Sequence, residues 1–164
     1  MAMIDGMIEE LKQESVSTRK HLERVPENAF DWKPHTKSMA MMQLASHIAD
    51  TPSWAAPLIN QDEMTFDPET YKPWIAGSKS ELLETFDKNV AGALEAMQGV
   101  TDDKMMVTWT MKMKEQIVLT LPRVAVLRVF ILGHLIHHRA QLGVYLRLRD
   151  VPVPQVYGPT ADEQ

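Results

Sequence analysis

Three of the six histidines in this sequence are clustered in residues 133–141. His134 and His138 are four positions apart, so on a helix their imidazoles lie one turn apart and about 40° apart around the axis. This spacing lets both rings reach one metal ion, as in helical zinc sites. A third imidazole is available at His47, which lies beside Leu44 on the apolar face of another predicted helix. We therefore expect His47, His134 and His138 to be metal ligands.

The alternative is that these histidines are ordinary core residues. A single inward histidine is more often hydrogen-bonded than metal-bound, and the four-residue spacing by itself has a high false-positive rate. Three buried imidazoles without a metal would, however, need three separate sets of hydrogen-bonding partners. The neighbouring His137 falls about 60° to the other side of His134 and is expected on the flank of the helix, outside the site.

Three neutral histidine ligands leave coordination positions open, which is typical of catalytic rather than structural zinc. An open position can activate water for hydrolysis, or hold a thiol in its deprotonated form for transfer to an electrophile. Because the sequence contains no cysteine, any such thiol must be an exogenous low-molecular-weight compound. The residues alone leave hydrolysis and thiol transfer open.

Two other residues are secondary candidates for catalysis. Asp50 follows His47 by three positions and could orient an imidazole or act as a base, although a solvated carboxylate is the commoner case. Tyr145 could donate a hydrogen bond to a substrate, or only satisfy its hydroxyl at the end of the helix. Trp32 and Trp54 could line a pocket, whereas Arg139 is expected to point away from the apolar face.

The elements that must position these residues are predicted to be helical. Four segments carry the apolar period of an amphipathic helix, at about residues 4–25, 38–58, 78–97 and 122–149. Pro52 and Pro57 predict a kink or an early stop in the second segment.

The connections between the helices indicate the topology. About 18 residues, 60–77, join the second and third helices, and they can travel the length of a helix before the next one starts. Residues 106–119 alternate weakly and favour a small hairpin. The predicted fold is therefore all-α: a single domain over residues 1–164, a four-helix bundle in up-down-down-up order with a long crossover.

Composition excludes several classes of protein. The chain has 164 residues, a formal charge of −5 and 45% hydrophobic residues, so it can form a packed core and lacks the basic excess of a nucleic-acid binder. No run approaches the roughly 18 apolar residues of a membrane span. The N-terminal segment becomes acidic at Asp5 and is unlike a signal peptide. A cytoplasmic protein is the default expectation.

Several segments resemble a known family. Residues 30–34 (FDWKP), 38–39 and 44–48 (LASHI) resemble the first motif of the DinB-like (DNA-damage-inducible, YfiT-like) metalloprotein superfamily. Residues 133–141 (GHLIHHRAQ) resemble its second motif, and residues 151–163 resemble the ending of one branch. The resemblance covers nearly the whole chain, and the two histidine motifs together are fairly specific.

The resemblance implies a four-helix bundle, a homodimer, and a zinc, nickel or iron ion held at positions matching His47, His134 and His138. It also implies a small-molecule substrate, because relatives with assigned activity are thiol S-transferases and a thiol-dependent isomerase, which slightly favours thiol transfer over hydrolysis. The competing interpretation is a non-catalytic metal-binding or stress-response protein. The predicted fourth helix supports a dimer independently, because it is apolar on more than one face. The alternative is that the long connections cover this surface within one chain. The off-face residues are Val129, Leu132, Ile136 and Leu146.

Overall fold

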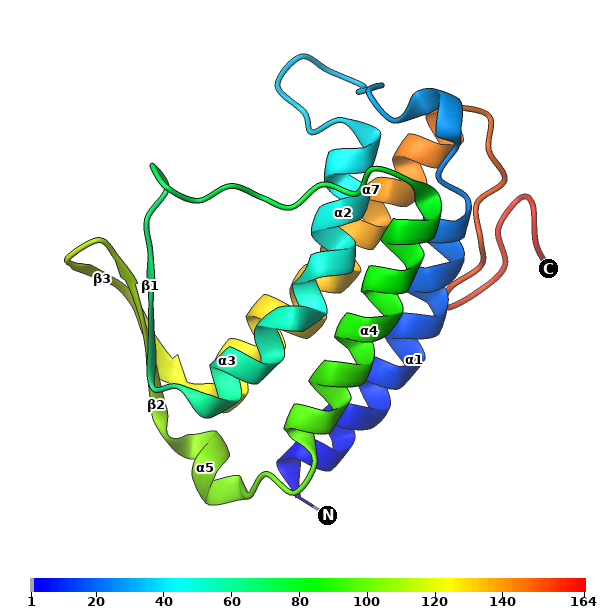
Figure 1. Ribbon diagram of the computed structural model, residues 1–164. Helices are drawn as coiled ribbons and strands as arrows, with labels where there is room; N and C mark the ends of the chain where they lie inside the picture. Colours follow the sequence, from blue (N-terminus) through cyan, green and yellow to red (C-terminus); the bar gives the residue numbers. More distant parts are fainter. Residues whose placement is uncertain (1) are drawn as a thin grey trace.

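The computed structural model describes residues 2–164, and its helices form a bundle with a small sheet at one side (Figure 1). The bundle helices are α1 (Met3–Glu23), α2 (Met41–Asp50) with its continuation η2 (Thr51–Trp54) and α3 (Ala55–Asn60), α4 (Lys79–Met97), and α6 (Arg123–Leu127) with η3 (Arg128–Gly133) and α7 (His134–Leu148). Two short helices, η1 (Glu27–Ala29) and α5 (Asp102–Met106), lie in the connections. Within residues 2–164, no helix has both the length and the apolarity that crossing a membrane requires.

The direction of each helix follows from the long connection after α3. In Figure 1, α1 and α7 run one way, while α2 with α3 and then α4 both run the other way. The connection returns along the length of the bundle to Ser78, whose hydroxyl caps α4 by accepting a hydrogen bond from the backbone N–H of Glu81 (3.2 Å). Pro52 lies where α2 gives way to the 3₁₀ turn η2, so the predicted break in the second helix is confirmed.

The expectation of an all-α fold is wrong, because the chain also forms a three-stranded mixed sheet in the order β1-β2-β3. The hairpin expected within residues 106–119 is present as β2 (Thr108–Met113) and β3 (Gln116–Pro122), which pair antiparallel. The strand missed is β1 (Glu63–Phe66), which lies in the crossover and pairs parallel with β2, with Met64 opposite Met111. Four residues are too few for a strand period to stand out from a loop.

The last bundle helix is interrupted just before its histidines. Residues 128–133 form a π-helical turn, η3, and α7 begins at His134. A Cβ at Gly133 would lie only 3.2 Å from the carbonyl oxygen of Arg128. Glycine, which has no side chain, therefore fits best at the end of this turn. A π-helical turn holds an additional residue and therefore shifts which side chains of the following helix face the core.

The buried face of α7 includes a charged residue. Leu135, Arg139, Leu142 and Leu146 are buried there, so the expectation that Arg139 points away from the core is wrong. Its guanidinium Nη1 donates to the carboxylate of buried Glu14 on α1 at 2.5 Å. Leu132 and Leu146, which suggested a second association face, are buried within this chain, whereas Val129 is 54% exposed.

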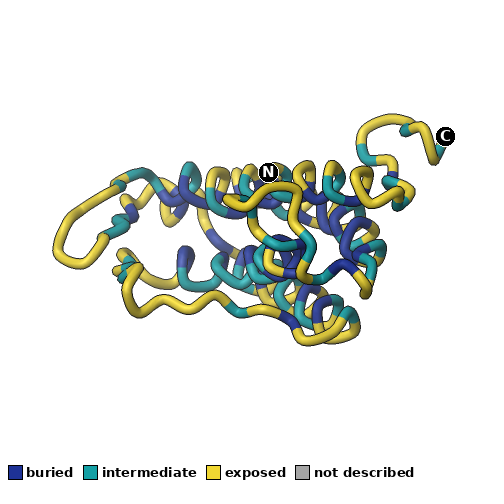
Figure 2. The backbone as a smooth tube through the Cα atoms, turned by 90° about the horizontal axis from the view of Figure 1, so that it is seen from above, coloured by how far each residue is buried: buried dark blue, intermediate teal, exposed yellow. Residues whose placement is uncertain are grey.

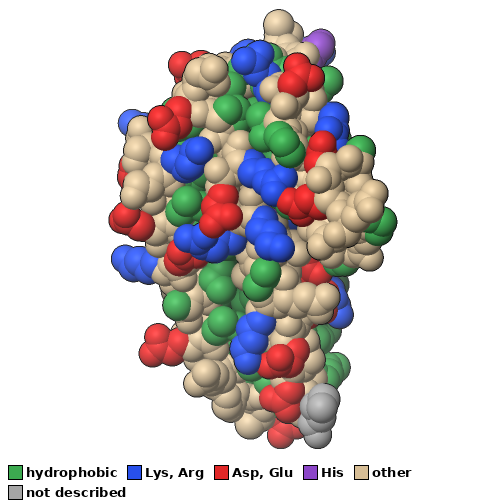
Figure 3. Space-filling view, turned by 90° about the vertical axis from the view of Figure 1, so that its right-hand side faces the viewer, with side chains coloured by type: hydrophobic (Ala, Val, Ile, Leu, Met, Phe, Trp, Pro, Cys, Tyr) green, Lys and Arg blue, Asp and Glu red, His purple; other side chains and the backbone are tan. Residues whose placement is uncertain are grey.

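Buried residues follow the inner faces of the helices, and the crossover and C-terminal segment are mostly exposed (Figure 2). The C-terminal segment is tied to the bundle by ion pairs, including Arg24–Glu163 and Arg147–Asp162. On the face in Figure 3, positive and negative side chains alternate with hydrophobic ones. That face therefore carries no continuous basic surface of the kind that binds nucleic acid.

Candidate metal centre

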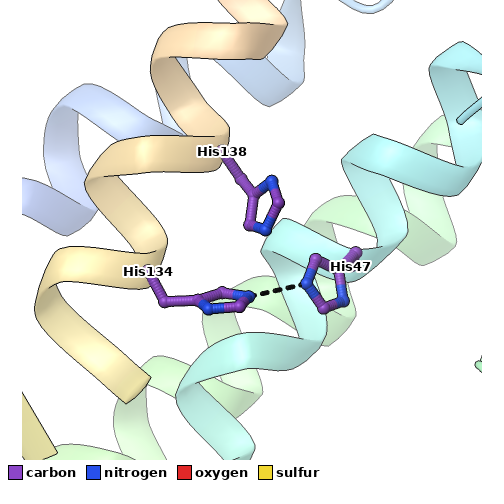
Figure 4. A group of neighbouring side chains, drawn as sticks. All are labelled: His47, His134 and His138. Atoms are coloured by element: carbon purple, nitrogen blue, oxygen red, sulfur yellow. Dashed lines mark hydrogen bonds between the residues drawn. The ribbon is translucent and has the colours of Figure 1, made fainter. Parts of the chain in front are cut away.

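The three predicted histidines meet between α2 and α7. One ligand nitrogen from each of His47, His134 and His138 lies within 4.8 Å of the others. The Nε2 atoms of His47 and His134 are 2.7 Å apart, and all three rings are directed into the space between the two helices (Figure 4). The arrangement results from one helical turn between His134 and His138 and from the packing of α2 against α7. Each ring is half-buried, which leaves one side of the group accessible.

Gln141 fixes the orientation of one of these imidazoles. The Oε1 atom of its amide lies 2.7 Å from Nδ1 of His138, and an amide oxygen can only accept a hydrogen bond. Nδ1 of His138 therefore carries the proton, and Nε2 is left with a free lone pair on the other side of the ring. The amide Nε2 donates to Nε2 of the exposed His137 at 3.1 Å. His137 lies outside the group of converging ligand nitrogens, as predicted. Sequence analysis did not assign this role to Gln141, although its spacing of three from His138 is visible in the sequence.

The electrostatics of the group favour neutral imidazoles. Burial, together with the neighbouring His138, His47 and His137, lowers the pKa of His134 to about 4. Burial is also the main cause of the lowered pKa values of His47 and His138. All three rings are thus uncharged at neutral pH and have lone pairs available. This donor set of three converging neutral nitrogens fits a zinc, nickel or similar divalent ion.

A cavity of about 550 Å³ borders this group. His47 and His134 form part of its wall, and Trp54 packs edge-on against both rings with centroid distances of 5.6 and 5.4 Å. The rest of the wall is mostly apolar and comes from α3, β1, the following turn, β2 and η3. Its residues are Pro57, Leu58, Met64, Thr65, Phe66, Asp67, Thr70, Tyr71, Trp109, Met111 and Phe130. Sequence analysis suggested Trp32 and Trp54 as wall residues, and of these two only Trp54 lines the cavity.

Comparison with known proteins places this fold in a family. The sequence model of the DinB superfamily matches residues 10–142, which include all three histidines and Gln141. The chain belongs to the DinB superfamily. A comparison with curated proteins gives no match.

Two solved DinB-like proteins share the fold. The protein from Bacillus subtilis is 18% identical, with a TM-score of 0.70 over 97% of this chain and 99% of that one. The protein from Bacillus cereus is 24% identical, with a TM-score of 0.70 over 93% of this chain and 97% of that one. At these identities the likeness concerns the fold alone.

In this DinB-superfamily chain, the two secondary candidates are held by other contacts. The Asp50 carboxylate accepts hydrogen bonds from Nε1 of Trp54 at 3.1 Å and from Oγ of Ser53 at 3.2 Å. Asp50 thus positions the indole that packs on the histidines. The Tyr145 hydroxyl donates to the carbonyl of Met39 at 3.3 Å, and its ring packs edge-on against Trp32. Neither Tyr145 nor Trp32 lines the cavity, and a catalytic role for Asp50 or Tyr145 stays a prediction.

Proposed function

We propose that His47, His134 and His138 bind one divalent metal ion, and that the protein is a metal-dependent enzyme that transfers water or an exogenous thiol to a small organic substrate. The observation that supports this best is the cavity, which reaches two of the three histidines. A structural metal site is closed by a fourth protein ligand, whereas a catalytic site keeps a position open. In the part of the chain that the structure describes, the group contains three such residues and no fourth.

Each residue of the site would have a distinct role in the reaction. When bound, a divalent ion acts as a Lewis acid that lowers the pKa of a water or a thiol and polarises a substrate carbonyl. The three histidines hold it, and Gln141 keeps His138 in the tautomer that presents Nε2. Trp54, held by Asp50, covers the edges of His47 and His134 and limits access of bulk water from that side. The cavity then positions the body of the substrate beside the histidines.

The test is an assay that separates the two nucleophiles. Protein loaded with zinc, nickel or iron is incubated with an activated ester, and separately with an epoxide or chloronitrobenzene, with and without a panel of low-molecular-weight thiols. Ester hydrolysis that needs no thiol supports the hydrolase. Conjugation that requires a thiol supports the S-transferase, and it should show no protein-bound intermediate because the chain has no cysteine.

His138→Ala is the inactive variant, and His137→Ala is its matched control on the same helix. Either activity should be lost in His138→Ala and kept in His137→Ala. If the metal-loaded protein is silent in both assays, the enzymatic proposal is contradicted and a non-catalytic metal-binding protein becomes the better account.

A further inference from the structure

The walls of the cavity indicate which substrates can enter it. We infer that the cavity beside the histidines accepts compounds with an uncharged, predominantly aromatic or aliphatic body and excludes those whose body carries a carboxylate or phosphate. The inference rests on the proposed function in one respect, namely that the reacting end of the compound faces His47 and His134.

The size and surface of the cavity suit an apolar body. Its volume of about 550 Å³ lies within the usual range for small-molecule sites, about 300–1,000 Å³. One wall comes from the helices, with Trp54, Leu58 and Phe130, and the opposite wall comes from the sheet, with Met64 and Met111 as cross-strand neighbours. Flat indole and phenyl faces and flexible methionine side chains favour aromatic and branched aliphatic groups.

The mouth of the cavity adds two further aromatic rings. Phe66, at the end of β1, and Tyr71 in the following turn lie with their ring centroids 5.0 Å apart. Tyr71 is 45% exposed, so this aromatic pair lies at the opening of the cavity to solvent. Polar groups are sparse here, and they comprise the hydroxyls of Thr65, Thr70 and Tyr71 and the carboxylate of Asp67.

The charge distribution excludes anions from this part of the cavity. Among the described wall residues, Asp67 carries the only formal charge, which is negative. No lysine or arginine is among the described wall residues. Two lysines of the neighbouring sheet are engaged elsewhere, because Lys112 pairs with Glu63 at 2.7 Å and Lys114 pairs with Glu69 at 2.6 Å. An anionic body would therefore lose its hydration against apolar walls, gain no cationic partner from the wall residues, and be repelled by Asp67.

A binding experiment tests this inference without catalysis. Isothermal titration calorimetry compares 2-naphthamide, 2-naphthylmethylammonium and 2-naphthoate, which share one ring system and differ in charge. The host is the His138→Ala protein, because His138 does not line the cavity and its removal prevents a metal from capturing the carboxylate. We expect the amide to bind at least about tenfold more tightly than the carboxylate, since an unpaired carboxylate costs more than about 1.4 kcal/mol to bury. The amine should also bind more tightly than the carboxylate, because its ammonium group can pair with Asp67.

Two substitutions in the same host show whether the wall charge decides the result. Thr70→Lys places a cation on the wall and should raise the affinity for 2-naphthoate about tenfold, whereas Thr120→Lys, on exposed β3 outside the wall, should leave it unchanged. Asp67→Asn keeps the side-chain oxygen that accepts from the backbone N–H of Glu69, and it should weaken only the amine.

Three outcomes would overturn the inference: equal binding of the carboxylate and the amide, equal effects of the two lysine substitutions, or no binding of any of the three compounds.

A failure of the inferred substrate class can be distinguished from a failure of the proposed function. Calorimetry on the His138→Ala protein reports on the cavity alone, whereas metal-dependent turnover is measured on the protein with all three histidines.

Discussion

Replacing Arg139 with Met should cause a large loss of stability, because it removes one partner of a buried ion pair. The side chains of Arg139 and Glu14 are only 3% and 7% exposed, and Nη1 lies 2.5 Å from the carboxylate oxygen. In the Arg139→Met protein, the buried carboxylate would retain one described hydrogen-bond donor, the Tyr157 hydroxyl at 2.9 Å. Because Arg139 directly follows His138, the pair also fixes the rotation of α7 that directs the histidines toward α2.

The magnitude follows from the burial. Breaking a buried pair by removing one partner costs about 3–5 kcal/mol, because the remaining charge is left in an apolar environment. For a chain of this length, each kcal/mol lowers the melting temperature by about 2–4 °C, so the expected decrease is about 6–20 °C. Removing both charges in Glu14→Leu/Arg139→Met should recover part of this loss, because no unpaired charge remains.

The assay is thermal and urea unfolding followed by circular dichroism, with a chelator present so that metal binding does not contribute to stability. Arg147→Met is the matched control, since Arg147 lies on the same helix and its ion pair with Asp162 is exposed. The control should lose only a small fraction of the stability that Arg139→Met loses. The reasoning is refuted if the two single variants are equally stable, or if the double variant is less stable than Arg139→Met.

Three further predictions concern other parts of the chain. Burial lowers the pKa of His21 below its ordinary 6.5, so the unfolded state binds more protons and the free energy of unfolding should fall as the pH drops below about 6.5. His21→Asn should remove part of this pH dependence in urea titrations between about pH 7.5 and 5. The prediction is contradicted if the free energy of unfolding of the variant changes with pH as steeply as that of the wild type. Gly133→Ala should destabilise the protein by about 1–3 kcal/mol in the same titrations, because its Cβ would crowd the Arg128 carbonyl. Gly92→Ala, which has open space in α4, should instead stabilise it by up to about 1 kcal/mol. Finally, light scattering at micromolar concentration should give the mass of a homodimer, and a monomer mass would rule out a stable one.

The bundle helices were predictable because apolar residues recur along each of them at helical spacing, although the π-helical turn and Arg139 interrupt the apolar face of the last one. The predicted helix at 78–97 differs from α4 by one residue, because the cap at Ser78 and the apolar stripe both indicate the same helix. Strand β1 was not predictable, because it has only four residues and its partner, β2, lies more than 40 residues further along the chain. Pairing at that distance leaves no local pattern in the sequence.

The histidine group was predictable for a related reason. The four-residue spacing of His134 and His138 is a local property of one helix, and His47 lies on a face that must turn inward. Arg139 was misplaced because a charged residue was assumed to face solvent, and its partner Glu14 is on α1, far away in sequence. Phe66 and Trp109 were missed as cavity residues because the cavity forms only where the sheet meets the helices.

The most direct test of the account is the metal content of the purified protein, measured by elemental analysis after metal loading and removal of unbound ions. We predict about one divalent ion per chain in the wild type and in His137→Ala, and none in His138→Ala, because only His138 is directed at His47 and His134. No metal in the wild type, or equal metal in the two variants, would contradict the assignment of the three-histidine group as a metal centre.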